Sequence, residues 1–154
     1  MRLRRLVVDR GFRALNVLHR SILRVSGGRL GSSAFNMTMV ELHTIGRRSG
    51  QAHTVLLAAP VVDGETLVLV ASKGGDHREP DWLKNLLAHP DVDVTIRGER
   101  RPVHARVADA VEQVELWPRV IGAYRPYATY RRRANRVIPL VVCEPREDSD
   151  GRRV

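Results

Sequence analysis

The chain has 154 residues, the usual size of one domain, and its 43 % hydrophobic residues suffice for one buried core, which excludes wholesale disorder. A formal net charge of +9 favours an anionic partner: a nucleic acid, an acidic membrane surface, or a small molecule with phosphates or carboxylates. The one cysteine, Cys143, excludes an intrachain disulfide and indicates a reducing compartment, so a cytoplasmic location is expected.

Residues 1–36 are predicted to form an amphipathic helix followed by a linker. At a helical period the apolar stripe contains Leu3, Val7, Ala14, Leu18 and Val25, and a basic stripe contains Arg2, Arg13, Arg20 and Arg24. No apolar run is long enough to span a membrane. Two interpretations stay open. The helix packs on the domain, or it lies on an anionic surface as a peripheral contact with the inner face of the cell membrane.

From Met37 the hydrophobic period changes from helical to alternating, which indicates strands. The patterns predict strands over residues 37–45, 53–62, 66–72, 92–96, 102–107 and 138–143, and helices over residues 80–89, 109–121 and 124–135. The pair Asp63-Gly64 is typical of a two-residue hairpin turn. About six mostly antiparallel strands with inserted helices predict an α+β fold, a small split β-barrel over residues 37–145. The acidic end of the chain from Glu144 on is expected to fray, with residues 146–154 as a flexible tail.

Two basic turns that contain glycine follow predicted strands. Gly46 to Gly50 reads GRRSG, and Ser72 to Gly75 reads SKGG. In such turns successive N–H groups can face an anion while charged side chains bind its oxygens. Because the two strands between them are expected to form a hairpin, both turns should lie at the same end of the sheet. Two such turns at one edge suit a ligand with an extended phosphate or carboxylate tail. Neither is a Walker loop or a dinucleotide-binding glycine motif, so a nucleoside triphosphate and a dinucleotide are disfavoured.

The other polar and aromatic candidates give weaker signals. The six histidines lack metal-ligand spacing, so no metal site is predicted, and Cys143 is expected in the core. All three tyrosines, Tyr124, Tyr127 and Tyr130, recur at every third position, which on one helix would bring only adjacent pairs together. They either pack in the core or line a cavity, where phenols can stack on a flat substrate and donate a proton.

The first basic turn is part of a longer recognisable pattern. Residues 44–51, TIGRRSGQ, resemble the T-x-G-R-K/R-S-G-Q turn of the deazaflavin (F420)-dependent nitroreductase family. Further matches, in the order that the family has them, lie at residues 71–75, 80–90, 117–118, 124–130 and 138–145. The resemblance covers about residues 40 to 145. Members of this family are small split β-barrel proteins that use coenzyme F420.

The resemblance implies an F420-dependent oxidoreductase that transfers a hydride from reduced deazaflavin to a quinone-like or nitroaromatic acceptor. It implies that the deazaflavin ring lies in a groove at the barrel and that its phosphate and oligoglutamate tail reaches basic residues. The implied cofactor-binding residues are Arg47, Arg48, Ser49, Gly50, Val55, Leu57, Ala71, Ser72, Lys73, Gly74, Trp82, Asn85 and Tyr127. The implied catalytic residues are Tyr124, Tyr127, Tyr130 and Ser72, with Tyr127 near the cofactor and Tyr124 and Tyr130 on the substrate side.

Three positions depart from the pattern of the family. His53 stands where the family often has an arginine, which should weaken the contact with the tail. Leu56 stands in place of a proline, although the backbone of Val55 and Leu57 can still face the ring. Ala58 replaces an aromatic residue that some members have, which should open the pocket and leaves the substrate undetermined.

Two alternatives to the F420-dependent reductase stay open. An FMN-binding split-barrel oxidoreductase would keep the fold, but the single phosphate of FMN would leave some arginines without a partner. A basic nucleic-acid-binding module is favoured by the charge of +9 and disfavoured by an aromatic content of 5 %, too low for stacking on successive bases. The sequence leaves the oligomeric state open.

Overall fold

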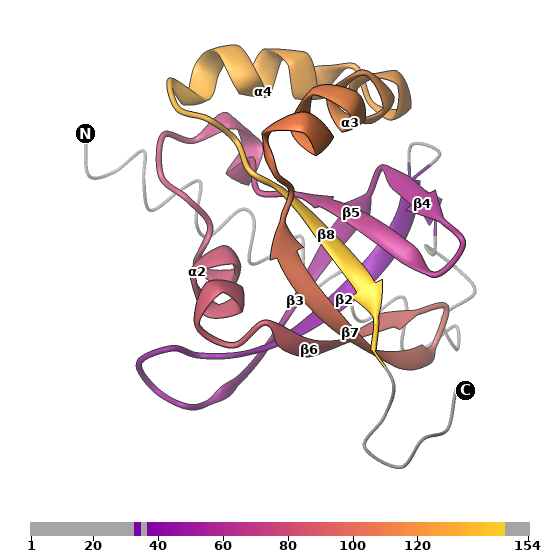
Figure 1. The fold of residues 1–154 in the computed structure, drawn as a ribbon. Coiled ribbons are helices and arrows are strands. Elements are labelled where there is room, and N and C mark those ends of the chain that lie inside the picture. The colour runs from indigo at the N-terminus through magenta and orange to yellow at the C-terminus, as the bar shows by residue number, and fades with distance from the viewer. Residues whose placement is uncertain (1–32, 35–36, 147–154) are drawn as a thin grey trace.

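The computed structural model of the chain describes residues 33–34 and 37–146, so the predicted N-terminal helix and the last eight residues lie outside the described part (Figure 1). The strands are β1 (Ser33–Ala34), β2 (Met37–Ile45), β3 (Ala52–Ala59), β4 (Val61–Asp63), β5 (Thr66–Val70), β6 (Asp91–Ile96), β7 (Glu99–Val107) and β8 (Leu140–Pro145). The helices are the short 3₁₀ turn η1 (Lys73–Gly75), α2 (Asp81–Ala88), α3 (Ala110–Ala123) and α4 (Pro126–Ala134).

All strand pairs are antiparallel and form one curled sheet in the order β1-β2-β6-β7-β8-β5-β4, with β3 paired to β2. The curl brings β3 into contact with β5, although these two strands form no ladder. The predicted mostly antiparallel, split-barrel α+β fold is therefore confirmed. The barrel is left open between β3 and β5, and η1 and α2 follow directly after β5 (Figure 1).

The strand ends differ from the prediction by up to three residues, as at Glu99, where β7 begins, and four further details differ. Residues 53–62 form two strands because the chain bends at Pro60, which has no N–H for a ladder. Asp63 still pairs with Thr66, so the hairpin turn is Gly64-Glu65, with Gly64 at a φ of 59°. The short strand β1 lies in the predicted linker and pairs with the start of β2. Glu144 is not frayed, because it completes β8 and pairs with His104.

The predicted helix over residues 124–135 begins later, at Pro126. Tyr124 is extended, with φ −152° and ψ 98°, and it ends α3. Proline at the first helical position starts α4, where its missing N–H costs nothing. Tyr124 therefore precedes α4, whereas Tyr127 and Tyr130 lie on it.

Two buried clusters stabilise the fold, one on each face of the sheet. Successive side chains of β5 alternate between them, so that Leu67 and Leu69 point into the curl and Val68 and Val70 point toward α3 and α4. Cys143 is fully buried in the inner cluster, as expected, and burial raises the pKa of its thiol to about 12. A thiol in this position is a core group, without the thiolate character that reactivity needs.

Candidate functional site

The first basic turn connects β2 to β3 and is held by hydrogen bonds among its own residues. The Gly50 N–H donates to the Gly46 carbonyl at 2.8 Å, and the Gln51 N–H donates to Ser49 Oγ at 3.2 Å. Gly50 has a φ of +64°, and a Cβ on Gly46 would lie 2.5 Å from Ser49 Oγ and 2.8 Å from His53 Nε2. The turn therefore favours glycine at Gly50 because of its φ, whereas a side chain at Gly46 would displace those of Ser49 and His53; the turn displays the exposed Arg47 and Arg48.

A buried amide on α2 anchors this turn. Asn85 Oδ1 accepts from the main-chain N–H of Arg47 at 3.2 Å and from Arg47 Nη1 at 3.3 Å, while Asn85 Nδ2 donates to Thr44 Oγ1 at 3.4 Å. Arg47 Nη2 also lies 3.7 Å from a carboxylate oxygen of Asp81. The amide of Asn85 is thus engaged with protein groups on both sides. If Asn85 contributes to cofactor binding as predicted, it would do so by orienting Arg47.

The second basic turn lies directly beneath α4. Lys73, Gly74 and Gly75 take left-handed φ values of 48°, 65° and 80° in succession. A Cβ on Gly75 would lie 3.0 Å from the Cα of Tyr130, so the helix that carries two of the tyrosines rests on the glycine itself. Ser72, the first residue of the turn, is buried, and its hydroxyl makes no capping hydrogen bond with η1.

The three tyrosine rings form one cluster, which differs from the prediction that only adjacent pairs would meet. Their centroids are 5.4 Å apart for Tyr124 and Tyr127, 5.7 Å for Tyr127 and Tyr130, and 6.4 Å for Tyr124 and Tyr130. The reason is the break after α3, which lets Tyr124 approach from outside α4. Burial raises the pKa of Tyr127 well above 10; burial, followed by a hydrogen bond with Tyr124, raises the pKa of Tyr130. Both phenols stay protonated at neutral pH and can donate hydrogen bonds.

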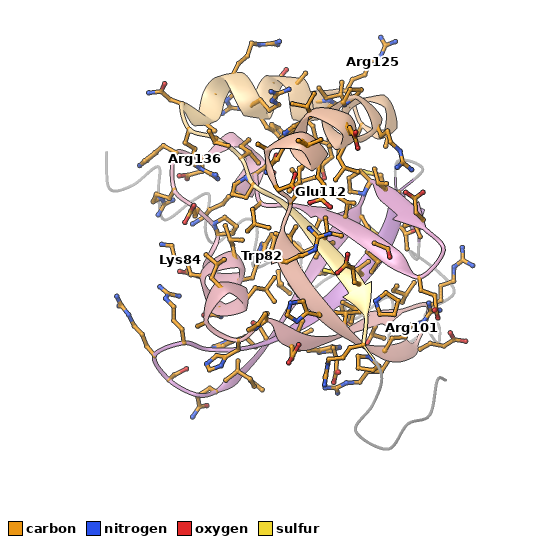
Figure 2. All side chains as sticks on the ribbon, in the orientation of Figure 1. Trp82, Lys84, Arg101, Glu112, Arg125 and Arg136 are labelled. Atoms are coloured by element: carbon orange, nitrogen blue, oxygen red, sulfur yellow. The ribbon has the colours of Figure 1, made fainter. Side chains whose placement is uncertain are left out.

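The apolar residues among the predicted cofactor-binding residues lie together near the opening of the barrel. Val55 and Leu57 on β3 pack against the inner cluster, which also contains Ala71 and Trp82. Figure 2 labels Trp82 on α2, and its side chain belongs to the same cluster. One edge of β3 has no strand partner among the described strands. Val55 and Leu57 are half-buried and leave apolar surface beside this unpaired strand edge, whereas Ala71 and Trp82 are buried beneath it.

The departing positions have different surroundings. His53 lies against Gly46 beside the first turn. Ala58 faces the other side of β3 and packs against the cluster that contains Tyr127.

The two basic turns lie on the side of the sheet where α2 lies, and in Figure 1 α2 stands between them. One is tied to α2 and the other supports α4. Together they supply guanidinium, ammonium and glycine backbone, which suits a ligand with a phosphate and several carboxylates. In the described part of the chain, no group of three or more His, Cys, Asp or Glu side chains is placed to hold a metal ion.

Sequence reasoning missed one residue of this region. The guanidinium of Arg136, which follows α4, is hydrogen-bonded to carbonyls on both sides of the second turn. No motif marks this arginine, because its partners are about 60 residues away in the chain and converge only in the fold.

Comparison with known proteins decides the family. Residues 16–145 match the family of the F420H(2)-dependent quinone reductases. The chain belongs to this family. The predicted family of F420-dependent reductases is thereby confirmed, together with coenzyme F420 as the cofactor and with an enzymatic function.

Individual relatives agree with this assignment. An F420H(2)-dependent quinone reductase of Mycobacterium tuberculosis is 37 % identical over 130 residues, which cover 81 % of this chain and 86 % of the relative. The solved structure of an F420-H2 dependent reductase superposes with a TM-score of 0.63 at 34 % identity and covers 69 % of this chain and 93 % of that one. Another structure, described as a domain-swapped dimer, has the same TM-score and identity and covers 69 % of this chain and 79 % of its own.

Proposed function

We propose that the chain transfers a hydride from F420H2 to a quinone that lies beside the tyrosine cluster. Membership of the quinone reductase family supports the reaction, and the close contact of Gly75 with Tyr130 supports the placement. That contact joins the predicted anion-binding turn to the backbone of the helix that carries Tyr127 and Tyr130, although turn and helix are far apart in the sequence. A cofactor phosphate on the turn and an acceptor beside the phenols would therefore be neighbours.

The cofactor-binding residues in this proposal are those that the sequence indicates. Arg47 and Arg48 would bind the carboxylates of the tail, and Lys73 with the N–H groups of its turn would bind the phosphate. Val55 and Leu57, together with Trp82, would hold the ring against the opening of the barrel and exclude water from it. When bound, F420H2 supplies the hydride.

The tyrosines would supply polarisation and a proton. A quinone that accepts a hydride needs one further proton to become a hydroquinone, and a phenol with a raised pKa holds that proton at neutral pH. In this proposal Tyr127 Oη or Tyr130 Oη donates to the quinone oxygen, and solvent restores the proton through the exposed part of Tyr130. Ser72 would orient the acceptor or the cofactor through its buried hydroxyl.

Family membership favours this function over the two alternatives, the FMN-binding oxidoreductase and the nucleic-acid-binding module. A nitroaromatic acceptor stays a prediction, as do a cytoplasmic location and a peripheral contact with the membrane through residues 1–36. Among the helices that the structure describes, none has the length and hydrophobicity to cross a bilayer.

Titration of the protein with F420, followed by cofactor fluorescence, tests cofactor binding. The rate of F420H2 oxidation, measured with 1,4-naphthoquinone, with a nitroimidazole and without an acceptor, tests hydride transfer to the acceptor. Saturable binding and faster oxidation with the quinone are expected. Binding without quinone-dependent oxidation would contradict the proposed acceptor, and absence of binding would contradict the proposed function as a whole.

A further inference from the structure

Arg136 donates hydrogen bonds to main-chain carbonyls of a segment that is distant in the sequence. Figure 2 labels this arginine near the end of α4, beside the segment that leads from η1 to α2. Its hydrogen bonds run from Nη2 to the carbonyls of Ala71 (2.9 Å), Arg78 (3.2 Å) and Ser72 (3.5 Å), from Nε to that of Asp76 (3.3 Å), and from Nη1 to that of Val137 (3.1 Å). Four of these five carbonyls belong to the segment that contains the second basic turn.

The charge of this guanidinium is not balanced by a carboxylate within the described residues. The nearby carboxylate of Asp76 is bound by Arg78, with Nε to Oδ1 at 3.0 Å and Nη2 to Oδ2 at 2.8 Å. These bonds hold the pKa of Asp76 far below its usual range. The contacts of Arg136 are dipoles instead, so its positive charge adds to that of Lys73 around the turn.

The geometry of the peptide bond relates the direction of these carbonyls to the direction of the neighbouring N–H groups. In a trans peptide the carbonyl of one residue and the N–H of the next point in opposite directions, and no cis bond occurs in the described chain. The carbonyl of Ala71 points toward Arg136, at 2.9 Å from Nη2. The carbonyl of Ser72 accepts from the Gly75 N–H at 2.9 Å and lies farther from Arg136, at 3.5 Å. The N–H group of Ser72, which shares a peptide bond with the Ala71 carbonyl, therefore points away from Arg136.

We propose that Arg136 is a positioning residue for the phosphate of F420, an inference that rests on the proposed function. By holding the carbonyls of Ala71, Asp76 and Arg78, it fixes the backbone on both sides of the turn and directs the N–H group of Ser72 to the other side, toward the anion. Arg136 itself does not touch the cofactor. Its role needs the several donors that a guanidinium spreads over a plane, which the single ammonium of a lysine cannot reproduce.

The test compares Arg136→Lys and Arg136→Gln with Arg119→Gln. Arg119 is a matched control, because it makes two bonds of 2.7 Å to Asp63 on the far side of α3, away from the turn. Each variant is titrated with F420 and with the deazaflavin that lacks the phosphate and the glutamates. Thermal unfolding verifies that each is folded, and hydrogen exchange of residues 71–78 is measured in the cofactor-free protein.

Both Arg136 variants should bind F420 about tenfold more weakly or worse. A tenfold change in affinity corresponds to about 1.4 kcal/mol, which is about what one misdirected charge-assisted hydrogen bond loses. Both Arg136 variants should bind the tailless deazaflavin as tightly as the wild type does. Arg119→Gln should bind F420 as tightly as the wild type does. Exchange at residues 72–76 should be faster, and the KM for F420H2 should rise while kcat and the KM for the quinone do not change.

Wild-type affinity for F420 in Arg136→Gln would overturn the inference. Full affinity in Arg136→Lys would also do so, because charge alone would then suffice. An equal loss for the tailless deazaflavin would overturn it as well, since Arg136 would then act only on the fold. If the wild-type protein bound no F420, the proposed function would fail, and unchanged exchange at residues 72–76 would separately refute the positioning role.

Discussion

Asn85 Oδ1 binds the main-chain N–H and the guanidinium of Arg47 at the same time, at 3.2 and 3.3 Å. One buried amide on α2 therefore fixes both where the first basic turn sits and where its arginine points. A turn that is ordered before it meets a ligand loses less entropy on binding. Asn85 thus links the packing of α2 to the affinity of the turn for anions.

Replacement of Asn85 by alanine should affect stability and binding together. Thr44, 3 % exposed, loses its side-chain donor, and a buried hydrogen bond of this kind contributes about 1–3 kcal/mol when its partner is left unpaired. We expect a lower midpoint in urea unfolding and weaker F420 binding. Asn85→Asp keeps an acceptor for Arg47 and should preserve more of the affinity. Equal affinity of Asn85→Ala and the wild type would contradict a positioning role for this amide.

Gly75→Ala should separate α4 from the second turn. The substitution costs about 1–2 kcal/mol for a left-handed residue with a Cβ, and the new methyl group would also lie 3.0 Å from the Tyr130 Cα. Gly64→Ala is the matched control, because Gly64 has a φ of +59° with nothing within 4 Å. Urea unfolding should show a greater loss for Gly75→Ala than for the control. If the two losses are equal, the contact between turn and helix contributes nothing beyond backbone strain.

The elements of the barrel could be predicted because local patterns determine them. Alternating apolar residues marked β2 at its observed bounds, and Gly98 marked the turn between β6 and β7, where Arg97 and Gly98 have φ values of 50° and 85°. The start of α4 was missed, although Pro126 at its first position is a signal that the sequence contains. That omission concealed the convergence of the three tyrosines.

The residues of the site could be predicted from the sequence only where they belong to a local motif. The two basic turns carry their glycines and charges in consecutive positions. The contacts of Asn85 with Arg47 and of Arg136 with Ala71 join residues 38 and 65 positions apart. Such contacts depend on how the sheet curls and on where α2 and α4 lie, which local patterns do not encode.

Acid should remove one contribution to stability at the start of α3. Arg106 binds both oxygens of Glu112, at 2.7 and 2.8 Å, and lowers the pKa of this carboxyl from 4.5 to about 2. A lowered pKa in the folded state stabilises the protein above pH 4.5, and the contribution is lost as the pH falls toward 2. Wild type should therefore be more stable than Glu112→Gln near neutrality, and the two urea midpoints should converge on acidification.

Glutamine at position 112 can still close the capping box with Asp109, so the comparison isolates the ion pair. Glu115→Gln, on the exposed side of α3, should leave the pH dependence of the wild type unchanged. A constant difference between wild type and Glu112→Gln from pH 7 to about pH 2 would contradict this account.

Tyr127→Phe should separate binding from turnover. The ring is buried, and phenylalanine keeps its packing with Tyr124 and Tyr130, so F420 affinity should stay at the wild-type value. If the phenol donates the proton, kcat with the quinone should fall by about 10²-fold or more. Unchanged kcat and quinone preference would leave Tyr127 as a packing residue. Tyr130→Phe, which removes the hydrogen bond with Tyr124, tests the other candidate donor in the same assay.

The double substitution Arg47→Ala with Arg48→Ala tests which part of the cofactor the first turn binds. Charge-assisted hydrogen bonds are worth roughly 1.5–3 kcal/mol each, so the loss of both arginines should weaken F420 binding by several kcal/mol. The tailless deazaflavin should bind wild type and variant alike, because the lost contacts go only to the charged tail. Salt should weaken F420 binding to the wild type more than to the variant, since screening acts on the charges that the variant lacks. Wild-type affinity in the double variant, or an equal loss for the tailless compound, would show that Arg47 and Arg48 do not hold the tail.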